Sequence, residues 1–216
     1  MDFKTFVEIS SKIKKSELPG FESQVKMSPP FRNDLIDKHR EAMKNAKKAG
    51  VMALFYPGKA GMAHLVLILR NTYKGVHSAQ VGFPGGRLEK QDEDLKATAL
   101  RETEEEIGVP QSAIEVIKKM TDLYIPPSNF TVSPYLGLAK ARPHFVKQDA
   151  EVKDIIEISV KTFLDEAHVT QVEVMTSLKK ELLVPAFRWH DHIVWGATAM
   201  MLSEIKDLLK RNLNAH

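Results

Sequence analysis

Three glutamates and an arginine lie close together in the run RETEEEIGV at residues 101–109. On a helix, which turns by about 100° per residue, Glu102, Glu105 and Glu106 fall within one arc of roughly 100°. Carboxylates four residues apart repel one another, so a cation is expected beside them. Hard divalent cations such as Mg²⁺ prefer carboxylate oxygens and leave positions open for phosphate oxygens. The spacing therefore indicates a metal site, and a solvated acidic helix face is the alternative.

Features on either side of the glutamates support the metal site. Arg101 precedes Glu105 by one helical turn, so its guanidinium can hydrogen-bond that carboxylate and hold its orientation. Gly85 and Gly86 follow a proline, and a turn of this kind lets the backbone approach an ion or a phosphate closely. Gly108 is expected to end the helix in a left-handed conformation. The segment thus predicts a glycine turn that leads into a bounded acidic helix.

This segment, RETEEEIGV preceded by FPGG at 83–86, resembles the signature of the Nudix hydrolase superfamily, G x5 E x7 REUxEExGU, where U is an apolar residue. Counted back from Arg101 by the family's spacing, the isolated acid of the signature falls at Glu93 and its first glycine falls at Arg87. This chain therefore has one extra residue between Gly86 and Glu93. Thr103 stands where an aliphatic residue is usual, while the four charged residues of the signature are all present.

The segment just upstream is similar to a motif of the coenzyme A pyrophosphatase branch of that family. The motif consists of an apolar strand, an arginine, and then GQV and FPGG, and residues 65–86 read LVLILRNTYKGVHSAQVGFPGG. Arg70, Gln80, Val81 and residues 83–86, which read FPGG, match this motif. Gly75 and Ala79 replace a usual arginine and a usual glycine. With further similar segments at 124–137 and 193–202, the resemblance extends over about residues 50–205.

The resemblance implies a catalytic set of Arg101, Glu102, Glu105 and Glu106. Glu102 and Glu106 are expected to bind Mg²⁺ or Mn²⁺, and Gly86 is expected to bring its backbone to the same site. Glu105 is either a third metal ligand or the general base, and Arg101 orients it. Some Nudix enzymes take the base from a distant loop, for which Glu151 and Glu157 are the candidates here.

The residues expected to contact the substrate are Arg70, Gln80, Phe83 and His77. Arg70, at the end of an apolar strand, can hold a phosphate through two hydrogen bonds, and a strand-end charge in solvent is the alternative. Gln80 has the same two interpretations. His77 can donate to a phosphate or can be an exposed loop residue. An apolar groove for a pantetheine arm is expected near Tyr124, Pro126, Pro127 and Phe130.

The function implied is hydrolysis of the diphosphate link of coenzyme A or an acyl-coenzyme A, which gives a phosphopantetheine and adenosine 3′,5′-bisphosphate. The alternative within the same chemistry is a hydrolase of another nucleoside diphosphate derivative, such as ADP-ribose or NADH. A Nudix-fold regulator that binds a nucleotide without cleaving it is an alternative of another class, although such proteins often lose a signature carboxylate. The related isopentenyl diphosphate isomerase needs a cysteine, and this chain has none.

Composition indicates one enzyme domain without disulfides or a membrane segment. The chain has 216 residues, 43% of them hydrophobic and 27% charged, with no cysteine and a net charge of +3. Its longest apolar stretch is far shorter than the roughly 20 residues that cross a bilayer. No signal core and no basic tract interleaved with aromatics is present, so we expect a cytoplasmic protein without nucleic-acid partners. A small nucleoside diphosphate derivative is the expected partner, and a homodimer is left open.

The expected fold class is α/β, a Nudix-like α/β/α sandwich with a mixed sheet between helices. Residues 1–50 are expected to form an N-terminal helical extension with helices near 3–15 and 33–48, and residues 51–216 the Nudix domain. The acidic helix should cover one face of the sheet, and a terminal helix near 197–212 should cover the other face. The strands are expected near 51–56, 64–70, 114–124, 131–139, 152–158 and 182–188.

Overall fold

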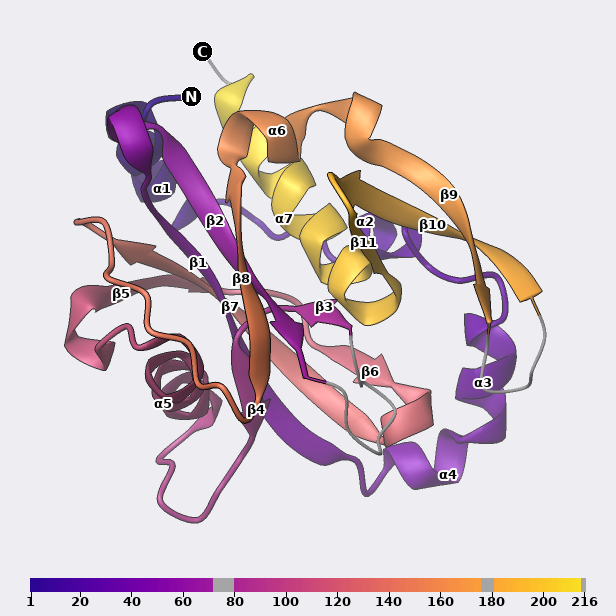
Figure 1. The fold of residues 1–216 in the computed structure, drawn as a ribbon. Helices are drawn as coiled ribbons and strands as arrows, with labels where there is room; N and C mark the ends of the chain where they lie inside the picture. The colour runs from indigo at the N-terminus through magenta and orange to yellow at the C-terminus, as the bar shows by residue number, and fades with distance from the viewer. Residues whose placement is uncertain (72–79, 176–180, 215–216) are drawn as a thin grey trace.

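A mixed sheet lies at the centre of the structure, with helices on both of its faces (Figure 1). The computed structural model describes residues 1–71, 80–175 and 181–214. Within those residues the sheet has eight strands, in the order β3-β2-β1-β7-β5, with β4 on β1, β6 on β7 and β8 on β2. The strands are β1 (Lys47–Pro57), β2 (Ala63–Arg70), β3 (Val81–Gly82), β4 (Gly85–Arg87), β5 (Ile114–Lys119), β6 (Leu123–Ile125), β7 (Phe130–Ala139) and β8 (Val152–Ser159). Only β1 and β7 pair in parallel, and the other pairs are antiparallel.

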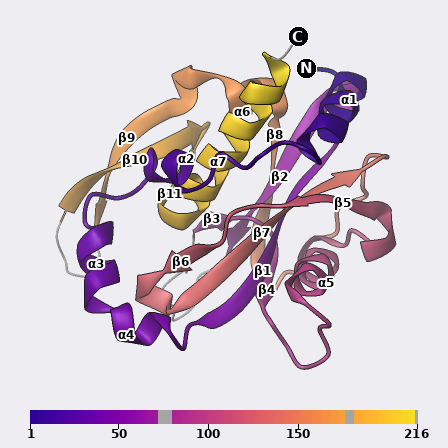
Figure 2. The same cartoon turned by 180° about the vertical axis from the view of Figure 1, so that it is seen from behind.

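Alternating side chains of the central strands feed two separate hydrophobic cores. In β1, Phe55 packs in the core beneath α1 (Phe3–Ile13) and α7 (Gly196–Leu213), while Leu54 packs on the opposite side beneath α5 (Leu95–Ile107). This period of two is what a strand buried on both faces requires. Figures 1 and 2 show α5 and α7 on opposite sides of the sheet. The predicted α/β/α arrangement with a mixed sheet is confirmed.

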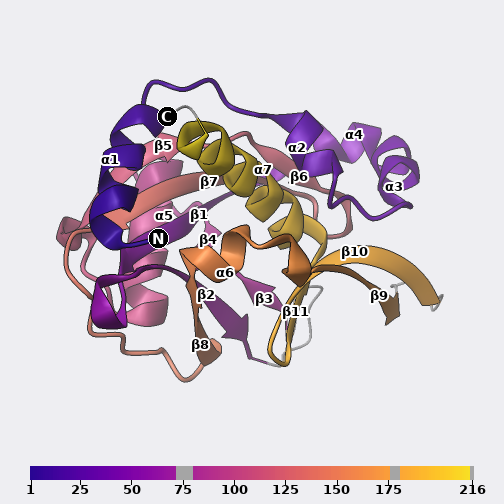
Figure 3. The same ribbon diagram turned by 90° about the horizontal axis from the view of Figure 1, so that it is seen from above.

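The N-terminal segment packs against the same body through aromatic and polar contacts. Phe6 of α1 is fully buried and its ring stacks on Phe55, with centroids 4.6 Å apart. The chain then runs past α7 to α2 (Phe21–Val25), α3 (Arg32–Lys38) and α4 (Arg40–Met43) (Figure 3). Gln24 of α2 donates to the buried Glu204 of α7 at 3.0 Å. The division at residue 50 stays a prediction, and β1 runs across it.

A smaller antiparallel sheet, in the order β11-β10-β9, stands beside the main one. Its strands are β9 (Val169–Met175), β10 (Glu181–Trp189) and β11 (His192–Trp195), and α6 (Val160–Leu164) leads into it from β8. Short 3₁₀ turns lie at Lys59–Gly61, Gln111–Ala113, Pro126–Ser128 and Glu166–His168. None of the helices in the described ranges has the length and apolarity that a membrane crossing needs.

Two sequence-based boundaries were wrong. The helix expected near 33–48 is two short helices, and β1 already begins at Lys47, because residues 47–50 pair with β7 on one side and partly with β4 on the other. The strand expected near 114–124 is two strands, β5 and β6, which both pair with β7. Tertiary pairing outweighed local preference in both places.

Candidate active site

Helix α5 runs from Leu95 to Ile107 and ends at the glycine that the sequence predicts. The side chain of Asp94 caps the first turn by accepting from the Ala97 backbone amide at 2.8 Å. Gly108 ends the helix at φ 71°, the left-handed stop expected there. Thr103, which replaces the usual aliphatic residue, is fully buried, and its hydroxyl donates to the Ala99 carbonyl at 2.6 Å. The substitution thus leaves no buried polar atom without a partner at that position.

The three glutamates of the predicted arc lie in different environments. The Glu106 side chain is 1% exposed and that of Glu102 is 13% exposed, whereas that of Glu105 is 57% exposed. Glu102 and Glu106 face the glycine turn, and Glu105 accepts a hydrogen bond from Arg101 Nη1 at 2.8 Å. The predicted contact between Arg101 and Glu105 is therefore present, while the buried carboxylates are the other two.

The glycine turn fits closely around those two carboxylates. The Gly85 amide donates to Glu106 Oε2 at 2.7 Å, from a backbone with φ 148° that L side chains rarely adopt. A Cβ on Gly86 would lie 2.2 Å from Glu102 Oε1, closer than real Cβ contacts occur. Only glycine at position 86 leaves Glu102 where it lies, which agrees with the expectation that this turn shapes the site.

A third carboxylate reaches the same place from outside the helix. Oxygens of Glu102, Glu106 and Glu151 all lie within 4.8 Å of one another. Glu151 stands just before β8, whose pairing with β2 sets Val152 opposite Arg70. Glu157, the other distant acid considered, instead accepts from the Tyr56 hydroxyl at 2.7 Å and pairs with Arg142.

Arg101 holds the region between the turn and the helix together. It donates to Asp92 through Nε at 2.8 Å and through Nη2 at 2.9 Å, a two-point contact that fits the planar guanidinium. This contact is the largest cause that holds the pKa of the Asp92 carboxyl well below its usual range and raises the pKa of Arg101. Glu93, which the family's spacing selects as the isolated acid, is exposed. The structure thus places Asp92, and not its neighbour, against Arg101.

Glu106 is a buried carboxyl with an unusual proton affinity. Burial raises its pKa to about 7, and the nearby charge of Arg70 and the Gly85 amide only partly oppose this. Arg70 Nη1 lies 3.0 Å from Glu106 Oε1, while Nη2 donates to the Gly85 carbonyl at 2.6 Å. Burial is also the main cause of the raised pKa of Glu102. A buried and a partly buried acid with raised pKa values, side by side, are a costly arrangement that a bound cation would relieve.

The carboxylate cluster fits a divalent cation. Oε1 of Glu106 is buried and accepts no hydrogen bond from the described residues, although the Arg70 charge is close, so this oxygen keeps a lone pair for a ligand. The donors are all carboxylate oxygens, the type that Mg²⁺ and Mn²⁺ prefer. Gly86 leaves open the space beside Glu102 that any side chain would fill.

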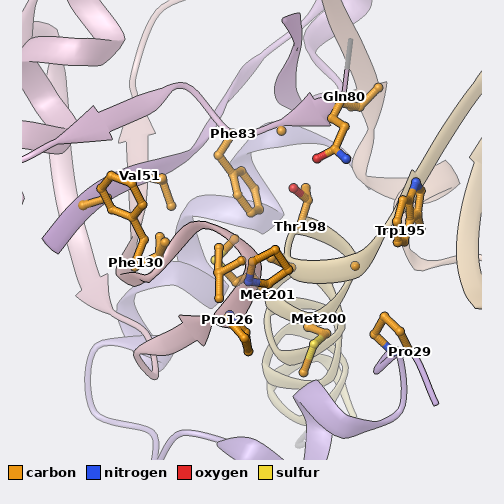
Figure 4. A pocket seen from close by; sticks show the side chains of 18 of the residues that line it. Pro29, Val51, Gln80, Phe83, Pro126, Phe130, Trp195, Thr198, Met200 and Met201 are labelled. Atoms are coloured by element: carbon orange, nitrogen blue, oxygen red, sulfur yellow. The ribbon is translucent and has the colours of Figure 1, made fainter. Parts of the chain in front are cut away.

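A cavity of about 810 Å³ opens at the glycine turn and extends to α3 and α7. Figure 4 shows Phe83, Val51 and Phe130 on one side of it and Met200, Met201 and Trp195 on the other. Both methionines are buried core residues, and they also line this space. The lining is mostly apolar, with a few polar groups near the carboxylates.

Most of the residues predicted to contact the substrate lie at the cavity. Arg70, Gln80 and Phe83 line the cavity, and so do Pro126, Pro127 and Phe130, whereas the ring of Tyr124 is buried beside it. Arg70 is not a strand-end charge in solvent, because it contacts Glu106 and Gly85. His77 lies outside the described residues.

The family model of the NUDIX domain matches residues 46–191, more than half of the chain. The chain belongs to the Nudix family. The helix with Glu102, Glu105 and Glu106 and the glycine turn in front of it lie within the matched range, and the protein is a Nudix pyrophosphohydrolase. Nudix hydrolases generally need a divalent metal, which agrees with the carboxylate cluster.

Curated relatives and solved structures agree with this membership. The uncharacterized Nudix hydrolases NudL of Yersinia pestis (strain Pestoides F) and Yersinia pseudotuberculosis (serotype O:1b, strain IP 31758) are each 30% identical to this chain over 142 residues, which is 65% of this chain and 70% of theirs. The crystal structure of a MutT/nudix family protein from Enterococcus faecalis covers 76% of this chain and 62% of its own, at 17% identity and a TM-score of 0.50. That likeness supports the Nudix fold alone.

Two residues of this Nudix site were not singled out by sequence reasoning. An acid at Asp92 belongs to the resemblance with the coenzyme A pyrophosphatase branch, but its contact with Arg101 was not predicted. Arg32, which precedes the Nudix domain match, lines the cavity. No motif marks Arg32, and the spacing of the signature points to Glu93 instead of Asp92.

Proposed function

We propose that this Nudix hydrolase splits the diphosphate link of coenzyme A or of an acyl-coenzyme A, giving a phosphopantetheine and adenosine 3′,5′-bisphosphate. The observation that carries the proposal is the cavity, whose lining combines apolar side chains with arginines and adjoins the carboxylate cluster through Arg70, Gly85 and Gly86. A pantetheine arm is long and weakly polar, and its diphosphate is strongly anionic, so each part meets a matching surface. The resemblance of residues 65–86 to the coenzyme A pyrophosphatase motif supports the same substrate.

The proposed metal ligands are Glu102, Glu106 and Glu151, with Mg²⁺ or Mn²⁺ as the cation. Such an ion, when bound, neutralises charge on the diphosphate and makes a bound water more acidic. Glu106 is held in place by the Gly85 amide, and Glu102 lies 3.0 Å from Arg101 Nη1. The backbone of Gly86 stays a proposed neighbour of the ion.

The remaining charged residues have proposed roles around the reacting water. A carboxylate must act as the general base that accepts the proton of the attacking water, and Glu151 and Glu105 are the two candidates. Glu151 is exposed and belongs to the cluster, whereas Glu105 is held by Arg101. Arg70 can turn part of its guanidinium toward a phosphate oxygen, because its side chain is 23% exposed in the cavity. Gln80 and Phe83 would contact the parts of the substrate next to the diphosphate.

The test is a substrate panel with Mg²⁺ and with Mn²⁺, containing coenzyme A, acetyl-coenzyme A, ADP-ribose and NADH. We expect the two coenzyme A compounds to have the highest kcat/KM and, in ¹⁸O water, to give phosphopantetheine and adenosine 3′,5′-bisphosphate. The Glu106→Gln variant should lose at least about 100-fold in kcat, since even residues that only support metal ligands cost 10- to 100-fold. If coenzyme A stays intact while ADP-ribose or NADH is split, the substrate assignment is wrong and the diphosphate chemistry stands.

A further inference from the structure

Arg32 is a buried cation without an acidic partner among the residues that the structure describes. Its residue is 7% exposed, and Nη2 donates to the Tyr124 carbonyl at 2.7 Å. Its Nε is buried and has no hydrogen-bond partner among the described residues. Buried arginines are normally paired, because an unpaired donor loses its hydration without replacement. Burial accordingly lowers the pKa of Arg32.

The place where Arg32 is buried is the wall of the substrate cavity. The ionisable residues in the described part of that wall are Arg32, Arg70 and Arg87, and no aspartate or glutamate is among them. Arg70 and Arg87 belong to the strands around the glycine turn, whereas Arg32 comes from α3 in the N-terminal segment. Arg32 meets this cavity where its guanidinium contacts the Tyr124 carbonyl, and among the described residues it forms no ion pair with Glu102, Glu106 or Glu151. The cavity therefore has a cationic position that does not contact the carboxylate cluster.

We propose that Arg32 binds a phosphate monoester of the substrate, as an anion-binding position separate from the diphosphate. A phosphate in the cavity would accept hydrogen bonds from the part of the Arg32 guanidinium that lines it, while Nη2 keeps its bond to the Tyr124 carbonyl. Guanidinium and phosphate match in shape and charge, so such a contact forms short, charge-assisted hydrogen bonds. If coenzyme A is the substrate, as proposed above, the group is the 3′-phosphate of its adenosine. The N-terminal segment, which lies outside the Nudix match at residues 46–191, then contributes to substrate selection.

The experiment compares substrates that differ only in this phosphate. We expect wild-type enzyme to have a KM about 10- to 100-fold lower for coenzyme A than for 3′-dephospho-coenzyme A, the range that one charge-assisted contact gives. Arg32→Gln should lose most of this preference with little change in kcat, and Arg32→Lys should keep part of it. Arg40→Gln removes the same charge from an exposed position of the same segment and should keep the full preference.

Each outcome decides the proposal. Equal KM values for the two substrates in wild-type enzyme would overturn it without any variant. An equal loss for both substrates in Arg32→Gln, together with a lower unfolding midpoint, would make Arg32 a structural residue. If Arg32→Gln does not fold, the wild-type and Arg32→Lys comparisons decide. If no coenzyme A compound is cleaved, the same comparison is made with NADPH and NADH, so that the substrate proposal can fail while a preference for the phosphorylated member still supports Arg32.

Discussion

The guanidinium of Arg70 lies 3.0 Å from the buried carboxylate of Glu106, and the same arginine donates to the Gly85 carbonyl, whose own amide donates to Glu106. The strand end, the glycine turn and the helix are thus joined at one point. Arg70 offsets only part of the cost of burying Glu106, because the pKa of that carboxyl remains at about 7. The site is arranged to receive more positive charge than the chain itself supplies.

The first prediction concerns pH and metal binding. A divalent cation displaces the proton of Glu106, so its affinity should rise as pH increases toward and past about 7, and binding should release protons. Calorimetric titration with Mn²⁺ in buffers of different ionisation enthalpy measures both quantities. Glu106→Gln should bind more weakly and with little proton release. An affinity that is constant between about pH 5 and pH 8 would contradict the assignment of Glu106.

The second prediction concerns the effect of Glu106 on the pH dependence of the unfolding free energy in the absence of metal. Because the pKa of Glu106 is raised from 4.5 to about 7 on folding, its favourable contribution is complete below pH 4.5 and is lost as pH rises through 7. The free energy of unfolding in EDTA should fall by about 3 kcal/mol, an upper estimate, across that window. Urea unfolding at several pH values measures it. Glu106→Gln should remove most of the slope, and Glu102, whose pKa is also raised, accounts for the remainder.

Helix α5 and buried strands such as β2 follow from local rules that the sequence carries. An aspartate cap, apolar spacing and a terminal glycine define α5, and buried strands such as β2 show as apolar runs. The strand β4 could not be predicted, because Gly85 and Gly86 have no strand preference and pair only since β1 lies opposite. The pattern of β9 was too weak, because most of its side chains are exposed. Strand pairing between residues that are far apart in the sequence decided both β4 and β9.

The same distinction between local spacing and long-range strand pairing applies to the candidate site. Glu102, Glu105, Glu106 and Arg101 lie within one helix, so their spacing alone brings them together. Glu151 reaches the cluster because β8 pairs with β2, where Val152 lies opposite Arg70, and the Asn71 amide donates to the Glu151 carbonyl at 2.8 Å. Spacing could nominate Glu151 together with Glu157 but could not choose between them.

The third prediction separates the acids that could act on the water. Glu151→Gln should lower kcat by about 100-fold or more, because the cluster loses a carboxylate and a candidate base. Glu157→Gln, which changes a carboxylate in the same strand region but outside the cluster, should change kcat by less than about twofold. Glu105→Gln is measured beside them with Mg²⁺. A large loss in Glu105→Gln with none in Glu151→Gln would make Glu105 the essential acid.

The fourth prediction tests the space that Gly86 leaves for Glu102. In Gly86→Ala the new Cβ would meet the Glu102 carboxylate, which can swing away because it ends a flexible side chain. We expect about 100-fold lower kcat/KM and weaker Mn²⁺ binding, with an unfolding midpoint close to that of the wild type. Gly82→Ala is the matched control, since its Cβ would make only an ordinary contact with Thr198 at 3.7 Å. Unchanged metal binding in Gly86→Ala would show that Glu102 does not need this space.

The fifth prediction compares the neighbouring acids Asp92 and Glu93. The spacing of the signature selects Glu93 as the isolated acid, whereas the structure places Asp92 against Arg101. Asp92 accepts from Arg101 at two points and also from the Thr98 hydroxyl at 2.9 Å, whereas Glu93 is exposed. Asp92→Asn should cost about 2 kcal/mol of unfolding free energy, the range for hydrogen bonds to charged groups, and should lower kcat about tenfold by loosening Arg101 and Glu105. Glu93→Gln should change neither quantity appreciably. The reverse result would mean that the extra residue before the helix does not move the acidic role from position 93 to position 92.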